Sequence, residues 1–198
     1  TQPYLLITCH PATLSDDPLA ETKALLGALE QFPNVGLVFT KSNADAGGDE
    51  INEAIEVFAK TRGNAVVYSS MGALGYLSAL SHCAAVAGNS SSGVVEAPSL
   101  QKPTVNIGDR QKGRLRCESI LDCQPTVQDV TRALRIALSP AFAARCRATS
   151  SPYNGGDTSG RIVALLGAFL TSDLAKKPKA FYDAPGCAGC DQHKHDEE

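Results

Sequence analysis

A serine-rich turn carries the strongest chemical signal in the sequence. Residues 88–93 read Gly-Asn-Ser-Ser-Ser-Gly and open a segment with helical features. The N-terminus of a helix offers free N–H groups and a partial positive charge, and serine hydroxyls add further donors. A simple serine N-cap would account for one serine but not for three. Ser90 and Ser91 are therefore candidate phosphate ligands.

Two further segments could complete an anion site at this turn. Glu96 lies about one and a half helical turns further along, where a carboxylate can accept hydrogen bonds from ribose hydroxyls. Residues 108–114 carry three cations within five positions. Such a run is commonly a solvated surface loop, although beside the serine turn one guanidinium could clamp a pyrophosphate. Arg110, the nearest to the preceding apolar run, is the best candidate, and together these groups suit a nucleoside diphosphate.

Polar residues also follow the first two apolar runs. Cys9 and His10 suggest a nucleophile–base pair, but neighbouring strand residues point to opposite faces and should not meet. We therefore expect Cys9 to be a buried thiol and His10 to be either a ligand contact or a structural histidine. Asn43 could reach a ligand or belong to a loop that caps the next helix. The glycine fingerprint G-x-G-x-x-G is absent, which argues against NAD or FAD, and no cofactor is expected.

The elements that must position these residues alternate regularly. Short apolar runs predict buried strands at residues 4–8, 35–39, 65–68, 84–87, 104–107 and 119–123. Helical patterns lie between and after them, at residues 18–32, 51–59, 73–80, a short stretch ending near 98, 130–138 and 162–170. This alternation predicts an α/β fold with a doubly wound parallel sheet. Ligands of such sheets bind beyond the carboxyl ends of the strands, where all the candidate residues lie.

Composition and charge argue against several classes of protein. The 198 residues carry a net charge of −3 and contain no apolar run near the roughly 20 residues that span a bilayer, so neither a nucleic-acid nor a membrane partner is expected. Seven cysteines in mainly apolar contexts indicate reduced thiols in a cytoplasmic protein. The chain starts at Thr1 and its only methionine is Met71, so we expect a piece of a larger protein. We expect one domain over residues 1–172, followed by a linker and tail over 173–198.

The tail contains two cysteines and two histidines, Cys187, Cys190, His193 and His195. This is formally a Cys2His2 set, but the two ligand pairs are much closer together than in a zinc finger. We expect a mobile tail without metal, with adventitious zinc binding as the alternative.

Four motifs together resemble the UDP-N-acetylglucosamine 2-epimerases, most closely their hydrolysing branch. They are Ile7-Thr8-Cys9-His10-Pro11, residues 43–47 (Asn-Ala-Asp-Ala-Gly), residues 88–98 with the serine turn and Glu96, and residues 106–114. The Pro152–Asp157 turn and Phe181-Tyr182-Asp183 also look like that branch. The non-hydrolysing branch typically shows Asp-Ser-Gly-Gly and a double glutamate in place of the residues found here.

The resemblance implies a Rossmann-like domain corresponding to the C-terminal half of a two-domain GT-B-type fold. It gives seven UDP-contacting residues, of which Ser69 is a weaker candidate near the uracil: His10, Asn43, Ser69, Ser90, Ser91, Glu96 and Arg110. In the family, UDP is eliminated to give a glycal, and water then adds to release N-acetylmannosamine. The carboxylates that do this belong to the N-terminal domain, so no catalytic residue is expected here beyond a supporting role for His10. The expected partners are UDP-N-acetylglucosamine, UDP and that N-terminal domain, and the full-length protein could be a homo-oligomer.

Two other functions remain open from the sequence. A GT-B glycosyltransferase domain shares the fold and the helix-terminus phosphate site, although residues 106–114 favour the epimerase. A non-catalytic module that binds nucleotide sugars would require that no catalytic domain is linked to this chain.

Overall fold

The computed structural model describes residues 2–12 and 17–178 of the chain. By its contacts the chain divides into two compact units, Thr1–Asn154 and Gly155–Glu198. This division falls before the boundary expected at residue 172, because the helix over residues 158–170 belongs to the second unit.

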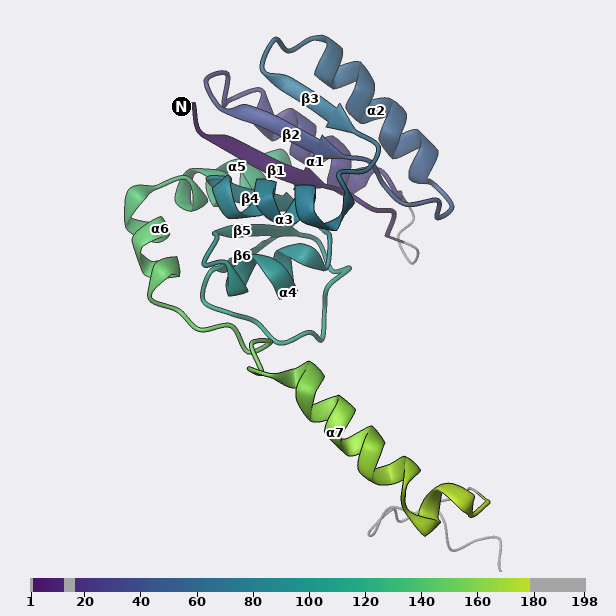
Figure 1. Cartoon of the computed structure of the whole chain (residues 1–198). Helices are drawn as coiled ribbons and strands as arrows, with labels where there is room; N and C mark the ends of the chain where they lie inside the picture. The colour runs from purple at the N-terminus through teal and green to yellow at the C-terminus, as the bar shows by residue number, and fades with distance from the viewer. Residues whose placement is uncertain (1, 13–16, 179–198) are drawn as a thin grey trace, which may run out of the picture. The chain divides into compact units, whose positions relative to one another are not determined.

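The first unit is built on a six-stranded parallel sheet (Figure 1). Its strands are β1 (Tyr4–Thr8), β2 (Gly36–Thr40), β3 (Ala65–Tyr68), β4 (Ala85–Gly88), β5 (Thr104–Ile107) and β6 (Ile120–Cys123). They lie in the order β3-β2-β1-β4-β5-β6. Strands β2 and β3 extend the sheet on one side of β1, and strands β4 to β6 extend it on the other side. The strand order therefore switches direction between β1 and β4, and doubly wound sheets bind ligands at such a switch point. The predicted fold class is confirmed.

Helices cover both faces of this sheet (Figure 1). On one face α1 (Ala20–Leu29), α2 (Gly48–Lys60) and α5 (Val127–Ala137) bury Leu25, Ile55 and Leu134 in a common core with the strands. On the other face α3 (Gly72–His82) and α4 (Ser92–Ser99) pack in a smaller cluster.

The central strand β1 shows why the short apolar runs form strands. Leu5 and Ile7 belong to the larger core, whereas Leu6 belongs to the smaller cluster on the other face, and all three side chains are fully buried. Successive strand residues point to opposite faces, so a strand covered on both sides must be apolar throughout. This double burial fixes the carboxyl end of β1, from which His10 follows.

The helices differ from the prediction in two main respects. The first helix begins at Ala20 rather than at Pro18, because the carbonyl of Asp17 accepts from the Ala20 amide in a turn that precedes the helix. The helix α6 (Pro140–Arg147) was not predicted at all. The Ser139 side chain caps it and Pro140 occupies its first turn, a combination typical of a helix start.

The second unit contains α7 (Thr158–Leu170) and a short 3-10 helix (Asp173–Lys176). Asp157 caps α7 by accepting from the Gly160 amide at 3.0 Å. Several large apolar side chains of α7 are exposed, among them Leu165 and Phe169.

Two searches of the described residues, 2–12 and 17–178, found nothing. No helix there is long and apolar enough to cross a membrane, and no group of three or more His, Cys, Asp or Glu side chains could hold a metal ion. The four tail residues with metal-binding side chains lie outside the described residues.

Candidate functional site

The serine turn begins with a glycine that no other residue could replace without strain. Gly88 ends β4 with a φ of 130°, and a Cβ placed on it would lie 2.0 Å from the carbonyl oxygen of Thr8. Only glycine adopts this conformation readily and allows the two strand ends to approach so closely. The turn is thereby held at the carboxyl ends of β1 and β4.

The serines do not cap the helix that they open. Ser91 is the N-cap residue of α4, yet its side chain makes no capping hydrogen bond. Ser90 Oγ accepts only a long bond, 3.4 Å, from the Ser92 amide. Within the described part of the chain, the main-chain N–H groups of Ser90 and Ser91 have no protein acceptor. Two amides and two hydroxyls are thus available at a helix N-terminus, as an anion requires.

Asn89 ties this turn to the end of β1. Its side-chain oxygen accepts from the His10 amide at 2.8 Å, and its side-chain nitrogen donates to the His10 carbonyl at 2.7 Å. The Asn89 carbonyl accepts from Arg110 Nη1 at 3.2 Å and from Gln111 Nε2 at 2.8 Å. Asn89 is 1% exposed. The segments that follow β1, β4 and β5 therefore meet at one buried residue, which binds the His10 segment through its side chain and the Arg110 loop through its main-chain carbonyl.

His10 is held as a neutral ring facing the loop after β2. Its Nδ1 lies 3.4 Å from the Asn43 amide, which donates to it, and 3.3 Å from Ser42 Oγ. Burial lowers the pKa of His10, and the positive charge of Arg110 lowers it further. A neutral ring that accepts at Nδ1 carries its proton on Nε2, which leaves that atom able to donate to a ligand.

Arg110 is an exposed cation at the serine turn. Its hydrogen bond to the Asn89 carbonyl directs the guanidinium toward the residues of the turn. Lys112, in the same loop, lies 3.7 Å from Asp109 in an exposed ion pair instead. Of these two cations, Arg110 is therefore the better placed to meet an anion bound by Ser90 and Ser91.

The remaining sequence candidates lie at different distances from this cluster. Asn43 is exposed, contacts His10 through its amide, and donates from its side chain to Asp45 at 2.7 Å. Glu96 is exposed in α4, after the serine turn. Ser69 is exposed just after the edge strand β3 and lines a different surface depression with Lys41 and Glu56. The structure thus joins His10 and Arg110 to Asn89 of the serine turn and Asn43 to His10, and it leaves Ser69 apart.

Three residues of the cluster were not proposed from the sequence as site residues: Glu21, Asn89 and Gln111. The Asn89 side chain donates to the carboxylate of Glu21, which is 8% exposed. Burial raises the pKa of Glu21 despite that hydrogen bond and the nearby charge of Arg110. Gln111 is 2% exposed, and its Oε1 has no partner within residues 2–12 and 17–178.

Cys9 is excluded as a nucleophile by its surroundings. It is 1% exposed, and burial raises the pKa of its thiol to about 12. A thiol with such a pKa stays protonated at neutral pH and is unreactive. The expectation of a buried thiol is confirmed.

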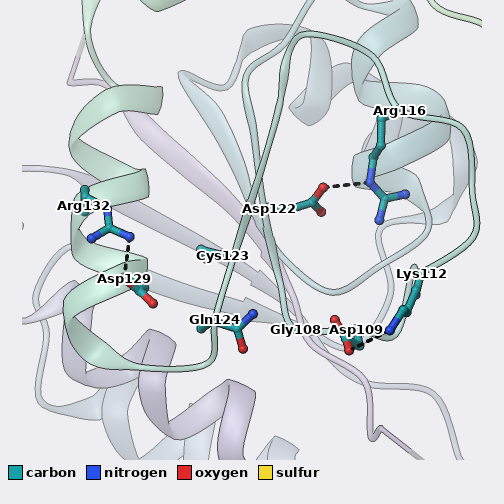
Figure 2. A pocket seen from close by; sticks show the side chains of 9 residues that line it. All are labelled: Gly108, Asp109, Lys112, Arg116, Asp122, Cys123, Gln124, Asp129 and Arg132. Carbon is teal, nitrogen blue, oxygen red and sulfur yellow. Dashed lines mark hydrogen bonds and ion pairs between the residues drawn. The ribbon is translucent and has the colours of Figure 1, made fainter.

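A separate cavity of about 350 Å³ lies behind the 108–114 loop, against β6 and α5 (Figure 2). Its cations are paired with acids: Lys112 with Asp109, Arg116 with Asp122, and Arg132 with Asp129. Their charges are compensated within the protein, so they offer less attraction to a phosphate than the serine turn does. None of the UDP-contacting residues expected from the sequence lines this cavity.

Solved structures share the fold of this chain. One is a Staphylococcus aureus MnaA–UDP co-structure, with a TM-score of 0.66 at 14% identity over 91% of this chain and 48% of the other. Another is Methanocaldococcus jannaschii UDP-GlcNAc 2-epimerase in complex with UDP-GlcNAc and UDP, with a TM-score of 0.66 at 17% identity over 85% of this chain and 46% of the other.

Relatives at higher identity are longer proteins. The polysialic acid biosynthesis protein P7 of Escherichia coli is 34% identical over 93% of this chain and 47% of its own length. The GDP/UDP-N,N'-diacetylbacillosamine 2-epimerase (hydrolyzing) of Campylobacter jejuni is 41% identical over 69% of this chain and 36% of its own length. The chain therefore spans about half or less of these relatives. The family model for UDP-N-acetylglucosamine 2-epimerase matches residues 1–167. The chain belongs to the UDP-N-acetylglucosamine 2-epimerase family.

Proposed function

We propose that this chain is the UDP-binding half of a hydrolysing UDP-N-acetylglucosamine 2-epimerase. The observation that carries the proposal is the serine turn, where two main-chain amides and two hydroxyls lie beside an exposed arginine and have no strong partner in the described part of the protein. Membership of the epimerase family and the Campylobacter jejuni relative, which is named as a hydrolysing epimerase of a nucleoside-diphosphate sugar, support a ligand of this class.

Each candidate residue has a role in this proposal. Ser90 and Ser91 hold the diphosphate through their amides and hydroxyls, and Arg110 compensates its charge. His10 donates to the ligand from Nε2 and supports the reaction without acting as its base. Glu96 accepts from the ribose hydroxyls. Asn43 and Ser69 are assigned to the remaining contacts with the nucleotide, Ser69 at the uracil.

The reaction itself needs groups outside this chain. We propose elimination of UDP to a glycal followed by addition of water, which releases an N-acetylmannosamine-type sugar. The carboxylates for those proton transfers are proposed to lie in the half of the relatives that this chain does not match. We further propose that the protein works in the cytoplasm and needs no cofactor.

Calorimetry with UDP and a coupled assay for sugar release test the proposal together. The chain by itself should bind UDP and release little or no sugar from UDP-N-acetylglucosamine. Absence of UDP binding would refute the binding role, and rapid turnover by this chain alone would refute the assignment of catalysis to another domain.

A glycosyltransferase domain is the second candidate, since the chain also shares its fold with the glycosyltransferase SnogD of Streptomyces nogalater, at a TM-score of 0.50 and 16% identity. Product analysis of a full-length protein that includes this chain separates the two candidate functions. Free N-acetylmannosamine supports the epimerase, and a sugar transferred to an acceptor supports the transferase.

A further inference from the structure

We propose that Glu21 is a positioning residue of the nucleotide site: through its hydrogen bond to Asn89 it holds the His10 segment, the serine turn and the Arg110 loop in register. This inference rests on the proposed UDP-binding function. Glu21 would contact neither the nucleotide nor the reacting atoms.

The position of Glu21 makes it unusual among the acidic residues that the structure describes. It stands in the first turn of α1, where acidic residues are common, yet its side chain is turned into the protein and is 8% exposed. A buried carboxylate is costly unless its oxygens are hydrogen-bonded. The Asn89 side-chain nitrogen supplies such a bond to Oε2, and Arg110 is close enough to stabilise the charge.

The hydrogen bond to Glu21 completes the set of bonds that fixes the orientation of the Asn89 side chain. Both donor positions of its side-chain nitrogen are used, one by the His10 carbonyl and one by Glu21, while its side-chain oxygen is used by the His10 amide. A rotation of this side chain would break all three bonds. Its main-chain carbonyl, held in the same residue, is the acceptor for Arg110 and Gln111.

The second carboxylate oxygen of Glu21 fits the loop after β5. A Cβ on Gly108 would lie 2.0 Å from Glu21 Oε1, and Gly108 has a φ of 72°. The loop that carries Arg110 therefore starts in contact with the Glu21 carboxylate. Glu21 therefore contacts the Arg110 loop directly at Gly108. It is also linked to Arg110 indirectly, because Asn89 binds both residues.

The hydrogen bond, rather than the charge, is what the site requires of Glu21. A second negative charge near a bound diphosphate repels it, so the carboxylate cannot serve as an electrostatic attractor. Glutamine at this position keeps an oxygen that accepts from Asn89, whereas alanine removes it. The two substitutions therefore separate positioning from charge.

The test compares Glu21→Ala, Glu21→Gln and the control Glu53→Gln, which neutralises an exposed carboxylate in α2. By calorimetry, UDP should bind the alanine variant about tenfold more weakly, as expected for loss of one hydrogen bond to a charged group. UDP should bind the glutamine variant and the control within about twofold of the unsubstituted chain. Equal affinity in the alanine variant, or equal weakening in both Glu21 variants, would overturn the proposal.

Amide hydrogen exchange provides a readout that needs no nucleotide. The His10 amide, which donates to Asn89, should lose protection in the Glu21→Ala variant, while the Leu37 amide, bonded to the Asn64 carbonyl in the sheet, should keep it. Unchanged protection of His10 would contradict the positioning role even if UDP does not bind at all.

A second variant covers the case in which Glu21→Ala does not fold. Gln111→Leu removes the buried bond from Gln111 to the Asn89 main-chain carbonyl together with an oxygen that has no partner among the described residues, so the fold should tolerate it. It too should weaken UDP binding, by about fivefold to tenfold. Unchanged affinity in this variant would count against a site positioned through Asn89.

Discussion

Replacing Ser90 and Ser91 together with alanine should weaken UDP binding without loosening the fold. In the proposed complex each hydroxyl donates to a charged phosphate oxygen, and the two backbone amides remain after the substitution. Loss of the two hydroxyl bonds should cost about 1–3 kcal/mol, or roughly 5-fold to 150-fold in affinity. Binding should therefore be weaker but still measurable.

The structure explains why stability should hardly change. Ser91 makes no capping bond, and Ser90 accepts only the 3.4 Å bond from the Ser92 amide, so the helix loses little when both hydroxyls go. The matched control is Ser99→Ala at the opposite end of α4, where the hydroxyl donates to the Val95 carbonyl at 3.3 Å.

The assay pairs calorimetric titration with UDP and thermal unfolding of the same samples. The double variant should lose affinity at an unchanged melting temperature, and the control should keep its affinity. The reasoning is refuted if affinity stays the same, or if it falls only in step with the melting temperature, because the serines would then serve the helix alone.

The other predictions concern separate parts of the account. Glu96→Gln should reduce UDP affinity modestly, since one of two acceptors remains, at an unchanged melting temperature without UDP; a lower melting temperature would contradict the ribose role. Arg110→Ala should weaken UDP binding by about 1.5–3 kcal/mol, with a smaller salt dependence in calorimetry, and an unaltered salt dependence would contradict direct phosphate contact. His10 has a lowered pKa in the folded state, so the unfolded chain binds its proton first and stability should fall as pH drops below about 6.5. His10→Gln should flatten that part of the pH profile of urea unfolding, and an identical profile would contradict the lowered pKa. Leu134→Ala, at a fully buried position of α5, should cost about 2–5 kcal/mol in urea unfolding, and a loss below about 1 kcal/mol would contradict its place in the core.

The strands could be predicted because burial on both faces of the sheet requires apolar side chains along their whole length. A parallel strand covered on both faces must be apolar throughout, so runs such as Leu5-Leu6-Ile7 are visible without any partner information. The six observed strands each lie within one residue of the predicted bounds at either end. Helix ends were less accurate, because the turn at Asp17 and the start at Ala20 depend on local hydrogen bonds that periodicity does not register.

The helix α6 was not predicted from the sequence because its buried face is small. Only Phe142 and Cys146 of its eight residues are buried, too few to show a helical period. The Ser139-Pro140 pair is the signal that could have revealed it, as a capping serine followed by a first-turn proline.

Part of the candidate site could be predicted from consecutive residues, whereas another part depends on contacts between segments that lie far apart in the sequence. The serine turn could be predicted, since its residues are consecutive and their place after a strand follows from the alternation. Glu21 could not, because it lies 68 residues before Asn89 and a glutamate in the first turn of a helix is ordinarily exposed. Only the strand order that sets β1 beside β4 brings the two together.

The most direct test of the account is an NMR titration of the isotope-labelled chain with UDP. The account predicts that the largest shifts fall on the amides of Ser90 and Ser91, which have no protein acceptor in the described part of the chain, followed by His10 and the Arg110 side chain. Shifts concentrated instead on Arg116, Asp122 and Arg132 around the cavity in Figure 2, or no shifts at all, would contradict it.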